Sequence, residues 1–200
     1  MKKPSTGTFS ILAISPDSRL MGVAVASGST SMADRVPHAK LGVGVIATQA
    51  YTNVAYGIKG LELLARGLSP EQTLDRLLME DPRRELRQVA VMDFKRRKAV
   101  FTGIKVPEFR GEIVGEGYVV AGNLLAGKEV VSSMAREFEN SSGDLAWRMA
   151  RALKAGSEGG GDRRGETSAA LIVVSTEKVE VETKVDKHAN PFGELFRRLG

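Results

Sequence analysis

G-T-F-S-I-L-A-I at residues 7–14 and L-M-G-V-A-V-A-S at residues 20–27 set the architecture of this chain of 200 residues. S-P-D-S at residues 15–18 has the composition of a turn, so we expect the two stretches to form paired strands. In the second stretch valines alternate with alanines, which makes both faces apolar. That pattern is typical of a strand buried on both sides and predicts the middle of a layered fold.

The remaining segments come in the order strand, two helices, strands, two helices, strands. S-P-E-Q at residues 69–72 is a capping box that opens one helix clearly. We expect strands at 41–50, 86–94, 98–103, 117–122, 167–174 and 178–185, and helices at about 61–67, 70–80, 128–139, 144–155 and 192–199. Each helix pair needs a sheet face to cover. The order predicts an α+β fold, a four-layer αββα sandwich of two mainly antiparallel sheets, in a single domain spanning residues 1–200.

The composition excludes several classes of site. The absence of cysteine rules out disulfides, thiolate metal sites and a cysteine nucleophile, and the two histidines lie far apart, so we expect no metal and no cofactor. The net charge of +5 is spread along the chain and aromatic residues make up only 6%, which argues against a nucleic-acid surface. No apolar run reaches the ~18–20 residues of a membrane span, and no secretory signal is visible, so we expect no membrane association and a cytoplasmic protein.

Thr8 is the first candidate catalytic residue. A threonine hydroxyl is a weak nucleophile that needs a base close by. Cleavage between Gly7 and Thr8 would give Thr8 a free α-amine with an unperturbed pKa near ~8, which is such a base. Residues 1–7 are then a propeptide; in an uncut chain they are a disordered leader and Thr8 is an ordinary strand residue.

Polar side chains follow several of the expected strands, and strand ends commonly carry binding sites. They are Gln49, Tyr51 and Asn53 after strand 41–50, Asn123 after strand 117–122, and Asp162 and Arg163 in the glycine-rich segment 156–165. Each has a structural alternative as well. Those near residue 50 and Asn123 could cap the helices that follow, and Asp162 could pair with Arg163 or Arg164.

Five motifs in order resemble one known family. They are T-F-S-I at 8–11, G-V-A-V-A-S at 22–27, G-V-G-V-I-A-T-Q-A at 42–50, G-N-L-L-A-G at 122–127 and G-G-D-R-R-G at 160–165. Together with D-K-H-A-N-P at 186–191 they resemble the domain-of-unknown-function family 1028, which is placed in the N-terminal-nucleophile (Ntn) hydrolase superfamily. The resemblance runs from Thr8 to about Leu199, and that family has no settled activity.

More distantly, the chain resembles proteasome and bacterial HslV-type protease subunits. This resemblance implies that Thr8 is the nucleophile, that Lys40 lowers the proton affinity of its amine and that the backbone near Ala50 and Tyr51 binds the oxyanion. It also implies that Asn123 supports the amine and that Asp162 supports the nucleophile. The chain departs from the protease pattern at two places. Ser27 and Gly28 stand where those proteases have an aspartate, and Gly165 replaces a serine.

Two functions follow from these residues. The first is an Ntn amidohydrolase that acts on a small or linear, peptide-like amide after Gly7–Thr8 is cut, with Thr8, Lys40 and Asp162 as catalytic residues. The second is an uncut, non-catalytic protein on the same scaffold that binds a small ligand. Substrate-binding candidates are Gln49, Ala50, Tyr51, Asn53, Asn123 and Arg163. In the binding protein the expected pocket is formed by Gln49, Tyr51, Asn123, Asp162 and Arg163 and holds a small anionic or amide ligand. The resemblance further implies a homodimer or higher homo-oligomer.

Overall fold

The computed structural model of the protein describes residues 7–200. Residues 1–6 of the expected leader lie outside the described residues. The described strands are β1 (Thr8–Ile14), β2 (Met21–Ser27), β3 (Pro37–Lys40), β4 (Gly44–Ala50), β5 (Arg87–Asp93), β6 (Lys98–Thr102), β7 (Gly111–Gly115), β8 (Tyr118–Asn123), β9 (Ser168–Val174) and β10 (Val179–Val185). The described helices are α1 (Ala55–Ala65), α2 (Pro70–Met79), the 3-10 turn η1 (Arg84–Leu86), α3 (Glu129–Asn140), α4 (Leu145–Glu158) and α5 (Pro191–Leu199).

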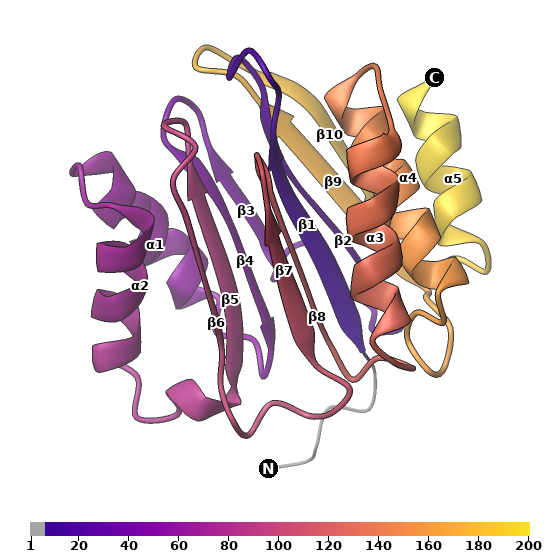
Figure 1. The fold of residues 1–200 in the computed structure, drawn as a ribbon, viewed down its shortest axis with the longest axis horizontal. Coiled ribbons are helices and arrows are strands. Elements are labelled where there is room, and N and C mark those ends of the chain that lie inside the picture. The colour runs from indigo at the N-terminus through magenta and orange to yellow at the C-terminus, as the bar shows by residue number, and fades with distance from the viewer. Residues whose placement is uncertain (1–6) are drawn as a thin grey trace.

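These strands form two antiparallel sheets (Figure 1). The six-stranded sheet has the order β10-β9-β2-β1-β8-β7, and the four-stranded sheet has the order β3-β4-β5-β6. The hairpin of β1 and β2 lies at the centre of the larger sheet, with Thr8 opposite Ser27 and Ile14 opposite Met21. The α+β class and the two antiparallel sheets are therefore confirmed.

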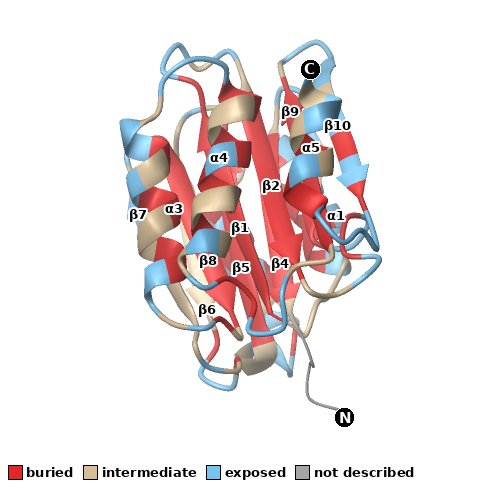
Figure 2. Ribbon diagram, turned by 90° about the vertical axis from the view of Figure 1, so that its right-hand side faces the viewer, coloured by how far each residue is buried: buried red, intermediate tan, exposed pale blue. Residues whose placement is uncertain are grey.

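Helices cover the outer face of each sheet, and the sheets face one another (Figure 1). One apolar cluster joins β1, β2, β8 and β9 to α3, α4 and α5, and another joins β4 and β5 to α1 and α2. A third fills the space between the sheets. Strands β1, β2, β5 and β8 are buried along their whole length, as Figure 2 shows for β1 and β2, because they are covered on both faces.

Two short strands and several element bounds differ from the prediction. Residues 41–43 form a turn rather than the start of a strand, because β3 and β4 make a hairpin there. β3 and β7 were not among the expected strands. α1 begins at Ala55, and α4 continues to Glu158, into the glycine-rich segment. None of the helices in residues 7–200 is both long and apolar enough to cross a membrane.

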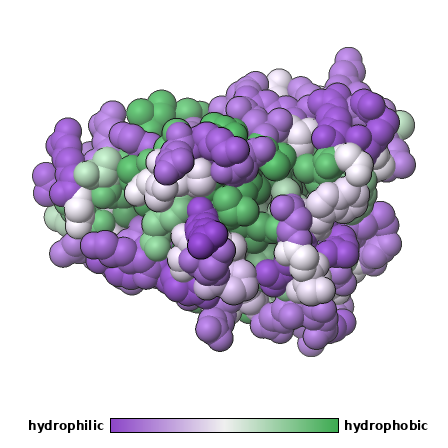
Figure 3. Space-filling model, turned by 90° about the horizontal axis from the view of Figure 1, so that it is seen from above, coloured by the Kyte–Doolittle hydropathy of each residue, from purple (hydrophilic) through white to green (hydrophobic). Residues whose placement is uncertain are grey.

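The layer between the sheets changes character from one end to the other. Alternate residues of a strand point to the same face. Leu12 and Ile14 of β1 belong to the cluster between the sheets, and Thr8 and Ser10 lie on the same face of the strand. We call the apolar end the region of Leu12, Ile14, Met21, Val23, Val45 and Met92. We call the polar end the region of Thr8, Ser27, Gln49, Gln88, Asn123 and Ser168, all of which are buried. Seen from above, the surface at the apolar end of the molecule has hydrophobic residues across its middle (Figure 3).

Candidate functional site

Thr8 stands at the polar end with its hydroxyl beside that of Ser27. Its Oγ1 lies 3.0 Å from Ser27 Oγ. Ser27 Oγ also donates to the carbonyl oxygen of Gly7 at 2.6 Å and accepts from the Ser29 N–H at 3.0 Å. The position follows from the hairpin register, since Thr8 and Ser27 are directly opposite on β1 and β2. The hydroxyl of Thr8 and the carbonyl oxygen that precedes it therefore share one hydrogen-bonding partner.

Asp162 holds the other polar atom of the residue before Thr8. Its Oδ2 accepts the N–H of Gly7 at 2.5 Å and the N–H of Gly28 at 2.9 Å, and its Oδ1 accepts the N–H of Arg164 at 3.1 Å. Asp162 thus binds the backbone at Gly7. The protease resemblance implied instead that it supports the nucleophile, Thr8.

Gly7 and Gly28, the N–H donors to Asp162 Oδ2, must be glycine because neighbouring atoms lie too close for a Cβ. A Cβ on Gly7 would lie 2.6 Å from the carbonyl oxygen of Leu124, and one on Gly28 would lie 2.4 Å from Asp162 Oδ2. Contacts this short do not occur without movement of the backbone or of the carboxylate. The Gly7–Thr8 peptide is therefore fixed at its N–H, at its carbonyl and by the lack of space around it.

Three amide side chains join the two sheets next to Thr8. Gln88 of β5 accepts at Oε1 from Gln49 Nε2 at 2.7 Å and from Asn123 Nδ2 at 3.1 Å. Its own Nε2 donates to Thr102 Oγ1 at 2.9 Å and to the Gly122 carbonyl at 3.0 Å. Asn123 Nδ2 also lies 3.4 Å from the Thr8 carbonyl oxygen. The structure thus brings Thr8, Gln49 and Asn123 together through Gln88, a residue that the prediction omitted.

The same network leaves two buried acceptors unused. Gln49 Oε1 and Asn123 Oδ1 have no hydrogen-bond partner among residues 7–200, although both side chains are 1% exposed. A buried carbonyl without a donor costs about 1–3 kcal/mol. The residues that follow them, Ala50 (φ 68°) and Leu124 (φ 53°), adopt the left-handed conformation that non-glycine residues avoid. Unpaired polar atoms and backbone strain of this kind cluster at functional sites.

A buried ion pair supports the segment after Ala50. Arg87 Nε donates to Asp81 Oδ2 at 2.8 Å, and Arg87 Nη1 donates to the Tyr51 carbonyl. Burial would raise the pKa of Asp81, but the hydrogen bonds from Arg87 and the Arg83 N–H outweigh it and lower that pKa. Burial next to Asp81 raises the pKa of Tyr56, whose hydroxyl donates to the same carboxylate. The ion pair therefore fixes the backbone at Tyr51.

The predicted oxyanion donor at Tyr51 and the role of Asn53 look different in the structure. The Tyr51 N–H already donates to the Leu86 carbonyl at 3.3 Å. Asn53 accepts from the Ala55 N–H at 3.2 Å at the start of α1, and its carbonyl accepts from Thr48 Oγ1 at 3.2 Å. Asn53 thus has the helix-capping role that was its structural alternative.

Lys40 and Arg163 are not part of this cluster. Lys40 is exposed and pairs with Gly44, at the opposite end of β4 from Gln49, which is ~17 Å along a strand of this length. The protease-like placement of Lys40 beside Thr8 fails because β3 pairs with the first residues of β4. Arg163 is exposed, and its Nε donates to the Leu125 carbonyl at 3.1 Å rather than to Asp162.

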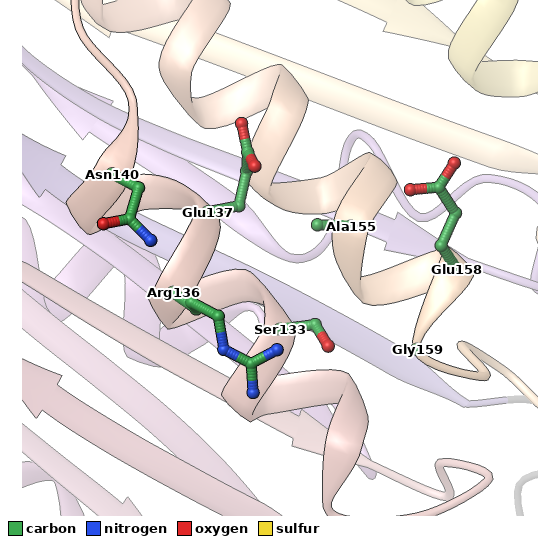
Figure 4. Close-up of a pocket in the computed structure, with 7 residues that line it drawn as sticks. All are labelled: Ser133, Arg136, Glu137, Asn140, Ala155, Glu158 and Gly159. Atoms are coloured by element: carbon green, nitrogen blue, oxygen red, sulfur yellow. The ribbon is translucent and has the colours of Figure 1, made fainter.

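One surface groove lies away from Thr8, on the helix layer. A groove of about 320 Å³ between α3 and α4 is lined by Ser133, Arg136, Glu137, Asn140, Ala155, Glu158 and Gly159 (Figure 4). It lies on the helix layer, on the other side of the larger sheet from the polar end. Within residues 7–200, no three His, Asp or Glu side chains gather in a way that could hold a metal ion.

Ser27 and Gln88 are the members of the site that sequence reasoning missed. Ser27 was noted only as a departure from the protease pattern. The register offered a signal, because counting outward from the turn pairs Ile14 with Met21 and hence Thr8 with Ser27. Gln88 gave a weaker signal, because it is one of two polar residues at the start of a strand whose middle is apolar, and its partners come from separate strands.

Comparison with known proteins agrees with the resemblance seen in the motifs. A family model described as "Family of unknown function (DUF1028)" matches residues 8–195. The crystal structure of protein SPO2555 from Silicibacter pomeroyi, which carries the same family label, is 31% identical with a TM-score of 0.89, and the alignment covers 96% of this chain and 84% of that one. Anbu, the ancestral beta-subunit from Yersinia bercovieri, aligns over 95% of this chain and 91% of its own at 11% identity and a TM-score of 0.44.

No curated protein matches the chain. The family match covers nearly the whole sequence, and the solved relative has the same fold over nearly the same span. The chain belongs to the family of unknown function DUF1028.

Proposed function

We propose that the protein is an Ntn amidohydrolase that cuts its own Gly7–Thr8 bond and then uses Thr8 to hydrolyse a small or linear amide. The observation that carries this proposal is the arrangement around that bond. The Thr8 hydroxyl and the Gly7 carbonyl share Ser27, while Asp162 holds the Gly7 N–H. The peptide is thus fixed beside a nucleophile, and fixed geometry of this kind accelerates an intramolecular attack.

In the first reaction Thr8 Oγ1 attacks the Gly7 carbonyl carbon and the acyl group moves from nitrogen to oxygen. This shift frees the α-amine of Thr8, and water then hydrolyses the ester, which releases the leader and restores the Thr8 hydroxyl. In the second reaction that amine takes the proton of the Thr8 hydroxyl as it attacks a substrate amide, and water releases the acyl group. The unpaired oxygens of Gln49 and Asn123 would accept N–H groups of the substrate, which favours an amide with N–H donors over an anion.

The experiment is intact-mass analysis of freshly purified full-length protein over time. We expect loss of Met1–Gly7 from the wild type and retention of these residues in Thr8→Ala. Thr73→Ala is the matched control, because Thr73 is also a buried threonine but lies on α2. A wild-type chain that stays full length at every pH and temperature at which it remains folded would falsify the proposal.

The alternative function is an uncut protein that binds a small ligand at the polar end. It is favoured by the complete hydrogen bonding of Gly7, because both its N–H and its carbonyl have partners in the intact chain. A panel of small amides and amines should then raise the melting temperature of both the wild type and Thr8→Ala. A shift that disappears in Thr8→Ala would argue for the hydrolase instead.

A further inference from the structure

The hydrogen bonds around Ser27 have a fixed direction. A serine hydroxyl has one proton and accepts at its lone pairs. The Gly7 carbonyl can only accept, so at 2.6 Å the Ser27 proton lies on that bond. The remaining contact of 3.0 Å must then use the Thr8 proton, with Ser27 Oγ as acceptor. The chain of donors runs from the Thr8 hydroxyl to the Ser27 hydroxyl to the Gly7 carbonyl oxygen.

No ionisable side chain hydrogen-bonds to the Thr8 hydroxyl within residues 7–200. Lys40, which the protease resemblance would place there, is exposed at the far end of β4. Ser27 is fully buried and Thr8 is 9% exposed, so a separated pair of charges at this point would be costly. Attack by Thr8 on the uncut chain therefore requires a route for its proton that creates no lasting charge.

We propose that Ser27 is a catalytic residue of Gly7–Thr8 cleavage and relays the Thr8 proton to the Gly7 carbonyl oxygen. The inference rests on the proposed role of Thr8 as nucleophile. As the bond from Thr8 Oγ1 to the Gly7 carbon forms, the carbonyl π bond breaks and its oxygen takes the Ser27 proton. Ser27 Oγ takes the Thr8 proton at the same time. The product is a neutral five-membered ring, and Ser27 is regenerated with one proton.

The ring then opens towards the ester. The bond from the Gly7 carbon to the Thr8 nitrogen breaks, the ring hydroxyl returns to a carbonyl, and its proton passes to the nitrogen, which becomes the free amine. Ser27 is on the path of this proton too, since it contacts the same oxygen. The Ser29 N–H donates to Ser27 Oγ at 3.0 Å and fixes the hydroxyl between its two partners. Water, the only co-reactant, hydrolyses the ester afterwards.

The test compares cleavage rates of full-length wild type, Ser27→Ala, Ser27→Thr and Ser10→Ala by intact mass. Ser10 is the matched control because it is an equally buried serine. It lies on the same face of β1 as Thr8 and has no partner among residues 7–200. We expect Ser27→Ala to slow cleavage at least ~100-fold, the lower range for a positioned proton-transfer group. Ser27→Thr keeps the hydroxyl and should restore cleavage, while Ser10→Ala should cleave like the wild type.

The outcomes separate the two proposals. A folded Ser27→Ala that cleaves at the wild-type rate overturns the relay and leaves the proposed function intact. A wild type that never cleaves overturns the proposed function, and the relay with it. If Ser27→Ala does not fold, Ser27→Cys replaces it, because a thiol is a weaker donor of similar shape. Wild-type speed in a folded Ser27→Cys chain then counts against the relay, and slower cleavage supports it.

Discussion

The two ends of the layer between the sheets are formed by the same strands, but one end is apolar and the other is polar. At the apolar end, β1 and β2 present Leu12, Ile14, Met21 and Val23, which pack against the facing sheet. At the polar end, six residues before Ile14 on β1, Asn123 donates to Gln88 and Gln88 donates to the Gly122 carbonyl, and these hydrogen bonds join the sheets. Hydrocarbon burial needs no direction, whereas buried amides must be paired. The comparison teaches that the apolar end supplies stability and that the polar end sets geometry.

The largest effect should come from a cavity at the apolar end. Leu12 is fully buried between the sheets. Leu12→Ala should lower the free energy of unfolding by about 2–5 kcal/mol, the range for such truncations. Four residues of strand, ~13 Å, separate it from Thr8, so the folded variant should still cut Gly7–Thr8 at the wild-type rate. Urea unfolding measures the free energy of unfolding, and intact mass measures the cleavage rate. Loss of cleavage in the folded variant would show that the two ends are not independent.

At the polar end we expect a smaller loss of stability, together with slower cleavage of Gly7–Thr8. Gln88→Ala removes the acceptor of Gln49 and Asn123 and should cost about 1–3 kcal/mol in urea unfolding. Because Asn123 also contacts the Thr8 carbonyl, cleavage should slow as well. Gln72→Ala, in the exposed capping box of α2, is the control and should change stability by about 1 kcal/mol or less without touching cleavage. Unchanged cleavage in Gln88→Ala would mean that the amide network is structural only.

The smallest effect is predicted for Ser10, which lies between the two ends. Its hydroxyl is fully buried and has no partner among the described residues. Removing an unpaired buried hydroxyl relieves a cost rather than breaking a contact. Ser10→Ala should therefore leave the free energy of unfolding within about 1 kcal/mol of the wild type or raise it. A larger loss in thermal or urea unfolding would show that Ser10 has a partner in solution and belongs with the polar end.

Much of the fold could be predicted because its signals are local. The turn at residues 15–18 predicted the central hairpin, and the capping box at Ser69 is present in full, with Gln72 bonded back to the Ser69 N–H. β3 and β7 gave no such signal. β3 has four residues and begins with proline, and β7 has five residues, begins and ends with glycine, and is exposed on one face.

The site could be predicted only where a local sequence pattern marks its residues. Gln49 and Asn123 were singled out because each is polar at the end of an apolar strand, Thr8 because it follows Gly7 at the head of one, and the structure brings the three together. Lys40 came from the protease resemblance alone, and the pairing of β3 with β4 moves it away. Contacts such as Gln88 with Asn123 depend on how the sheets stack, and no local sequence pattern determines that.

The hydrogen bonds of Asp162 also limit how easily the backbone next to the central hairpin can open. Its Oδ2 binds the N–H of Gly7, just before β1, and the N–H of Gly28, just after β2, and so closes the open end of the central hairpin. Loss of Gly7 would leave that oxygen with Gly28 alone and would change how easily the segment after β2 opens. Amide hydrogen exchange at Gly28 would then be a local sensor of whether the leader is still attached, although Gly28 lies 21 residues after Gly7 in sequence.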